Sequence, residues 1–122
     1  MVVSAFCLLS ISVQAGQNNI GQVVYIEGID DVPLMQGLEP DVNGSFIYDK
    51  AEGRIVEFQA YGVITPKEVL AFYSKTLPEL GWIKLDSSVY ERGDERLKIT
   101  FLQKNKVNKT AVHFNLAPKH LD

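Results

Sequence analysis

The chain has 122 residues, a length that suits one domain. Its 46% hydrophobic and 22% charged residues are typical of a globular protein and exclude a disordered or fibrous chain. The formal net charge of −3 gives no reason to expect a nucleic-acid-binding protein, although acidic residues gather before Thr65 and basic residues after it.

The first recognisable segment is an apolar run over residues 2–13, which has the length of a signal-peptide core and is too short to span a bilayer. Small residues, Val13 and Ala15, occupy the −3 and −1 positions of a cleavage site. We therefore expect residues 1–15 to be a signal peptide and residues 16–122 to form a single periplasmic or secreted domain, with no membrane span after cleavage. Because no basic segment precedes the run, a buried element of the domain and an uncleaved membrane anchor remain alternatives.

The single cysteine, Cys7, lies inside this run. Cleavage after Ala15 would leave a mature chain without a disulfide, a cysteine nucleophile or a cysteine metal site. The folded domain would then depend on its hydrophobic core alone, and about 107 residues are enough to form one.

Residues 23–29 have the composition of a strand, and residues 30–40, DDVPLMQGLEP, follow them. The prolines and glycine of this second stretch argue against a helix or a paired strand, yet several of its positions are apolar. Two interpretations stay open: its apolar side chains cover a sheet face or an open edge, or they form a docking surface in which Met35 is the adaptable contact. The candidate partner-binding residues are Val32, Leu34, Met35, Leu38 and, from a later strand, Tyr61.

The next elements are two strands over residues 45–50 and 54–64, joined at Gly53 into a hairpin. In the second strand apolar and polar residues alternate, which predicts one buried and one wetter face. Tyr61 falls on the face opposite Phe58, so we expect it on the wetter face, where it is less easily buried.

Residues 65–82 carry the clearest helix signal. Thr65 and Glu68 form a capping box, and Gly81 suits the left-handed residue that ends a helix. Pro78 predicts a kink or break just before it. The residues that share one face at helical spacing are Val69, Phe72, Tyr73, Leu77 and Leu80.

After the helix we expect strands over residues 82–85, 89–91, 96–103 and 110–117. In the last of them, Val112, Phe114 and Leu116 should point inward and His113 outward. A single helix among antiparallel hairpins predicts an α+β fold: a single antiparallel β-sheet with one amphipathic helix packed across one face.

The segment DVPLMQGLE (31–39) and the helix VLAFYSKTLPELGW (69–82) together resemble small exported proteins of α-proteobacteria. The FYxxxLPxxGW element recurs in short secreted or lipoprotein-type domains, and the likeness covers most of residues 30–117. The resemblance implies an exported domain of this type and implies no activity.

Candidates for catalysis and metal binding are few. A triad can be written from a serine at 87 or 88, His113 and Asp86, but nothing in the spacing supports it. The acidic residues of the 30–41 region lack the spacing of a calcium loop, and two isolated histidines do not predict a zinc site. We therefore expect no catalytic residue, no metal and no cofactor.

The sequence thus favours an exported cell-envelope protein that acts as a non-enzymatic binding or assembly module on an envelope protein partner. One alternative is a small-ligand carrier with a pocket between helix and sheet, lined by Phe58, Phe72 and Trp82. The other is a hydrolase, which would require His113 to lie in a cleft beside an acid and a hydroxyl.

Overall fold

The computed structural model describes residues 22–102 and 109–121. The described chain has the α+β class expected from the sequence, with one α-helix and two antiparallel sheets. In chain order its elements are β1 (Tyr25–Ile26), β2 (Ile29–Pro33), β3 (Glu39–Lys50), β4 (Gly53–Gly62), α1 (Pro66–Glu79), β5 (Ile83–Asp86), β6 (Val89–Arg92), β7 (Glu95–Leu102), β8 (Thr110–Pro118) and the 3-10 helix η1 (Lys119–Leu121). The expected single sheet is wrong, because β1 and β2 pair with each other in a separate two-stranded sheet.

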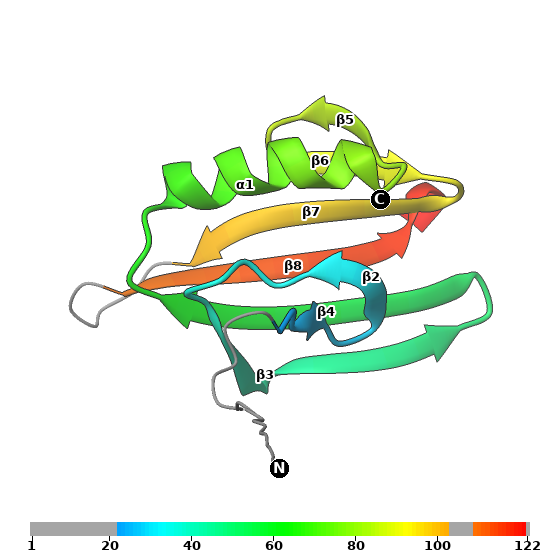
Figure 1. The fold of residues 1–122 in the computed structure, drawn as a ribbon. Coiled ribbons are helices and arrows are strands. Elements are labelled where there is room, and N and C mark those ends of the chain that lie inside the picture. The colour runs from blue at the N-terminus through cyan, green and yellow to red at the C-terminus, as the bar shows by residue number, and fades with distance from the viewer. Residues whose placement is uncertain (1–21, 103–108, 122) are drawn as a thin grey trace, which may run out of the picture.

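The main sheet has six strands in the order β3-β4-β8-β7-β6-β5, and every neighbouring pair is antiparallel. Figure 1 shows β3 at one edge and the short β5 at the other. The central strands β4 and β8 alternate buried and partly buried residues, so one face of the sheet is apolar and the other is wetter. The inward positions expected for Val112, Phe114 and Leu116 are confirmed, since all three are buried.

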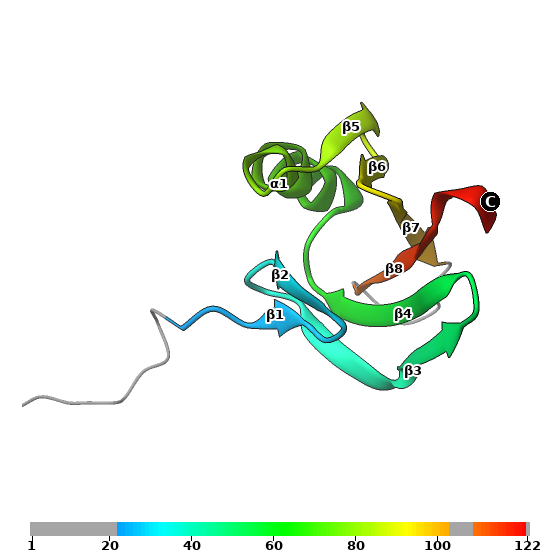
Figure 2. The same ribbon diagram turned by 90° about the vertical axis from the view of Figure 1, so that its right-hand side faces the viewer.

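One face of this sheet carries both α1 and the β1–β2 hairpin, which lie side by side (Figure 2). The helix contributes Val69, Tyr73 and Leu77 to the core. The hairpin contributes Ile26 and Ile29. The helix therefore covers only part of the apolar face, and the hairpin covers another part.

The capping box at the start of α1 is confirmed: the Glu68 backbone N–H donates to Thr65 Oγ1 at 3.1 Å, and the Thr65 N–H donates to Glu68 Oε1 at 3.0 Å. Gly81 ends the helix with a φ of 94°. We expected a kink or break before Pro78; the helix runs without a break through Pro78 to Glu79, so the break is wrong. Pro78 lies in the last turn, where a Schellman arrangement, with Trp82 N donating to Leu77 O at 3.1 Å and Gly81 N donating to Pro78 O at 3.1 Å, holds the chain helical.

Residues 30–40 contain more paired strand than their composition predicts. Residues 30–33 belong to β2, and Glu39 and Pro40 begin β3, so only residues 34–38 form a loop. Gly28 adopts a φ of 97° in the turn that joins β1 to β2. Both prolines lie in strands at the edge of their sheets, where a missing N–H need not break a ladder.

Two expectations concern residues that the structure does not describe: the signal peptide over residues 1–15 and most of the turn before β8. Within residues 22–102 and 109–121, no helix has the length and apolar character needed to cross a bilayer.

Candidate functional site

A groove with a volume of about 740 Å³ lies between α1 and the segment of residues 22–38. One wall is the side of the helix that carries Phe72 and Thr76, and the other is the start of the described chain together with β2 and the loop after it. The groove is lined by Gln22, Val23, Val24, Tyr25, Asp31, Pro33, Leu34, Met35, Gln36, Gly37, Leu38, Phe72, Thr76, Glu79 and Leu80. Apolar side chains dominate this lining, and a few polar groups lie among them, which is the usual composition of a ligand site.

A buried tyrosine holds the loop wall of the groove in place. The Tyr73 hydroxyl donates to Pro33 O at 2.8 Å, and it accepts a hydrogen bond from Met35 N at 2.9 Å. Burial raises the pKa of Tyr73 far above its ordinary value, so the hydroxyl keeps its proton and remains a donor. Its ring packs edge-on against Phe72 and Phe114, which fixes the position of the hydroxyl.

Two further backbone hydrogen bonds hold the loop. Leu34 N donates to Val24 O at 2.7 Å, which extends the β1–β2 pairing by one step. Leu38 N donates to Met35 O at 3.1 Å around a turn in which Gly37 has a φ of 102°. The wall is therefore tied both to the hairpin and to the helix.

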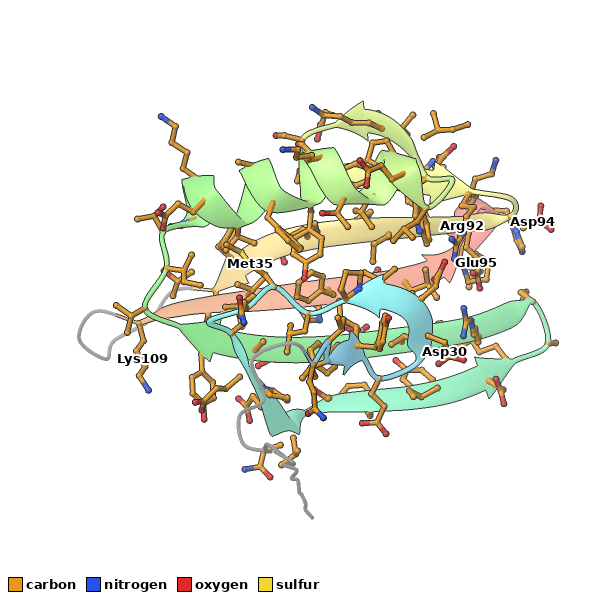
Figure 3. The ribbon with its side chains drawn as sticks, in the orientation of Figure 1. Asp30, Met35, Arg92, Asp94, Glu95 and Lys109 are labelled. Carbon is orange, nitrogen blue, oxygen red and sulfur yellow. The ribbon has the colours of Figure 1, made fainter. Side chains whose placement is uncertain are left out.

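The structure divides the five residues predicted to bind a partner. Val32, Leu34 and Leu38 are buried in the core, although Leu34 and Leu38 also border the groove. Met35 is partly buried and lines the groove, where Figure 3 shows it beside α1. The apolar loop thus packs largely on its own protein, and Met35 is the member that remains partly accessible.

Tyr61 lies outside the groove. It occupies the wetter face of β4, as expected from alternation, and the Lys109 ammonium lies 4.7 Å from the centre of its ring. Figure 3 shows Lys109 at the end of the long strands, away from Met35. The structure does not bring Tyr61 together with the loop residues.

Sequence reasoning missed the opposite wall of the groove. Val23, Val24 and Tyr25 are each about half exposed, and they face a helix surface that includes Phe72 and Leu80. The run of apolar residues at 23–26 was the available signal, but its position beside the helix depends on tertiary packing. Phe58 and Trp82, expected to line a pocket, are core residues outside the lining, whereas Phe72 does line it.

The end of the groove near the helix C-terminus is acidic. Asp31 accepts two hydrogen bonds from Arg92, at 2.7 and 3.1 Å, and Arg92 also donates to Leu80 O at 2.8 Å. These Arg92 hydrogen bonds hold the pKa of Asp31 below its ordinary value. Glu79 adds a second carboxylate to the lining, and the last helical turn contains no basic residue.

A polar cluster lies on the other face of the sheet. His113 Nε2 contacts Glu57 Oε1, and Asn115 Nδ2 donates to Glu57 Oε2 at 2.9 Å. His113 therefore has an acid beside it, but this pair lies on the outer sheet face and does not border the groove. Asp86 bonds instead to Ser88, so the structure does not join Asp86 to His113 as a triad would require.

Among the residues that the structure describes, no group of three or more His, Cys, Asp or Glu side chains is arranged to hold a metal ion. The groove is therefore apolar over most of its lining, tethered by Tyr73 and acidic at one end. No family model, no curated protein and no solved structure matches this chain.

Proposed function

We propose that the protein is a non-enzymatic binding module of the cell envelope, and that the groove between α1 and residues 22–38 receives an apolar segment of a partner protein. The observation that carries this proposal is the open apolar lining, in which Val23, Val24 and Tyr25 are half exposed although they lie beside the helix. Exposed apolar surface of this kind marks interaction sites in soluble domains. Tyr73 already fixes the loop wall of the groove, so the loop loses little conformational freedom when a partner binds.

Charge narrows the chemistry of the partner segment. At the helix C-terminal end, Asp31 and Glu79 carry two negative charges against one positive charge on Arg92, and the helix dipole adds a negative partial charge. The helix cation one turn before Glu79, Lys75, does not line the groove. A segment with apolar side chains and a basic residue at one end would complement this distribution.

The envelope location rests on the signal-peptide pattern of residues 1–15. If the pattern is cleaved as expected, the mature chain found outside the cytoplasm begins at Gly16. N-terminal sequencing of the protein from fractionated cells tests the envelope location separately from binding. A chain that keeps residue 1 would contradict the envelope location, and with it an envelope partner, but would leave the argument for the groove unchanged.

The binding proposal is tested by site-specific photocrosslinking in intact cells. A photoreactive residue at Val23, in the groove wall, should capture a defined partner, whereas the same residue at Val63, which is also exposed but outside the lining, should not. Glu79→Lys should lower the capture several-fold, and Glu52→Lys, in the turn between β3 and β4, should not. Equal capture at both positions, or a Glu79→Lys chain that captures as well as the parent, would contradict the proposal.

A small-ligand carrier is the second candidate, because about 740 Å³ lies within the range of small-molecule sites. Native mass spectrometry of protein isolated from its own cells distinguishes the two functions. A bound small molecule that is lost on Thr76→Arg, which places a long side chain in the groove, would favour the carrier over the protein-binding module.

A further inference from the structure

The main sheet ends in a long strand with an open edge. Within the described chain β3 pairs only with β4, and its free side runs along the edge of the molecule in Figure 1. An edge strand presents unpaired N–H and C=O groups, and proteins normally shorten, charge or bend such strands to prevent pairing. The opposite edge, β5, follows this rule, because it has four residues and contains Lys84.

The pairing of β3 with β4 is irregular in the first part of the strand and regular in the second. The register shifts between Asp41 and Phe46, where Gln59 N donates to Ser45 Oγ at 3.0 Å. From Phe46 to Lys50 the pairing with β4 is regular. This irregularity disfavours edge pairing over residues 42–45, and residues 46–50 contain no such irregularity.

The regular part carries three consecutive large apolar side chains that are exposed: Phe46 at 53%, Ile47 at 47% and Tyr48 at 42%. Phe46 and Tyr48 lie on the same face of the strand with their rings stacked, the centroids 5.6 Å apart. A regular, irregularity-free stretch of edge and an apolar surface therefore coincide at residues 46–48, followed by the charged Asp49 and Lys50.

The direction of the backbone groups fixes which pairings are possible. Lys50 and Gly53 flank the two-residue turn, so Lys50, Tyr48 and Phe46 direct their backbone groups toward β4. Ile47 and Asp49 then direct theirs toward the open edge. A second copy of β3, antiparallel and centred on Ile47, would pair Ile47 with Ile47, Phe46 with Tyr48 and Ser45 with Asp49.

We propose that β3 is a self-association edge, through which two copies of the chain join their six-stranded sheets about a two-fold axis at Ile47. This register places apolar residues opposite apolar residues on both faces and opposes no like charges. Each of the three exposed side chains has on the order of 100 Å² to bury, or roughly 600 Å² for both copies before the backbone is counted. That area is below the ~1,200 Å² of stable interfaces, so the dimer should be weak and should form only at micromolar or higher concentration.

The first test is analytical ultracentrifugation of the full chain over concentrations from low micromolar to millimolar. The parent should shift from monomer to dimer, and Tyr48→Lys should weaken dimerisation at least about tenfold, because each substitution enters the interface twice. The matched control is Ile83→Lys on the opposite edge, which is also exposed and should leave the dimer unchanged. A parent that stays monomeric, or a dimer that Ile83→Lys disrupts as strongly as Tyr48→Lys, would overturn the proposal.

The second test examines the register and depends on no destabilising variant. In a chain in which Cys7 is replaced by Ser, Ile47→Cys should form a disulfide-linked dimer under mild oxidation, because residues that exchange backbone hydrogen bonds have Cα atoms about 5.5 Å apart. Asp49→Cys should not, because two copies of residue 49 would lie four residues apart, roughly 13 Å along the strand. Crosslinking that is equal at both positions would refute this register, and crosslinking at neither would refute the interface.

Discussion

Tyr73→Phe is the substitution that most directly tests how the groove wall is held. It removes one oxygen atom and keeps the ring, so packing against Phe72 and Phe114 is retained. What is lost is the hydrogen bond to Pro33 O and the hydrogen bond from Met35 N. The two backbone groups then lose their partner at the junction between loop and helix.

The expected magnitude follows from these two bonds. A hydrogen bond within a protein contributes about 1 kcal/mol net, and an unsatisfied buried group costs more than that. Because Met35 is only partly buried and water can reach part of the loop, we expect the free energy of unfolding to fall by about 2 kcal/mol. For a domain of this size such a loss lowers the melting temperature by roughly 10 °C.

The assay is urea unfolding with thermal melting of the full chain, and Tyr90→Phe is the control. Tyr90 is as completely buried as Tyr73, but its hydroxyl lies farther from its partners, at 3.2 Å from Ser74 Oγ and 3.3 Å from Ser87 O. Removing the Tyr90 hydroxyl should lower the free energy of unfolding by less than half as much as removing the Tyr73 hydroxyl. If Tyr73→Phe were as stable as the parent to within about 0.5 kcal/mol, the hydroxyl would not hold the loop, and the argument for a preformed groove wall would fail.

Two further predictions concern the same region. Gly62→Ala would place a Cβ 2.2 Å from Gly37 O in the loop backbone, so it should lower the free energy of unfolding in urea by about 3 kcal/mol. Gly93→Ala is the control: Gly93 has a φ of 61° and open space around it, so its substitution should cost about 1 kcal/mol. Equal losses would contradict the close approach of Gly62 to the loop. The pKa of Asp31 is lowered by Arg92, so the ion pair stabilises the fold above the ordinary carboxyl pKa and is lost as the pH falls through the lowered value. Near neutral pH the parent should have a slightly higher free energy of unfolding than Asp31→Asn, and urea unfolding at a series of pH values should show this difference disappearing below about pH 4. A difference that persisted or grew there would contradict the assigned sign.

Local signals in the sequence were sufficient for the helix and most of the main sheet. The capping box at Thr65 and the left-handed Gly81 are interactions among residues near in sequence, and the structure contains both. The alternation in β8 was equally readable, because a strand with one buried face shows a period of two. The sequence reading of Pro78 counted its clash with the preceding turn and left out the bonds that Gly81 N and Trp82 N make back to Pro78 O and Leu77 O.

The region of residues 23–40 could not be predicted in the same way. A hairpin whose first strand has two residues shows almost no periodicity, and its burial depends on a helix about 40 residues later in the chain. The same reason explains the site. Met35 was identified because it lies in an apolar stretch that is rich in proline and glycine. The wall formed by residues 22–25 exists only because the hairpin docks beside α1.

The groove has a physical origin in the width of the main sheet. Six strands present an apolar face wider than one helix can cover, and α1 lies on one side of it while the hairpin fills the other (Figure 2). A helix and a two-stranded sheet have different profiles, so the seam between them stays partly open; Tyr73 bridges it in the middle, and Arg92 links Asp31 to Leu80 O at the end of the helix. The exposed apolar residues of the seam are thus a direct consequence of covering one face with two dissimilar elements, and a partner segment that filled the seam would complete the layer that residues 22–102 and 109–121 leave open.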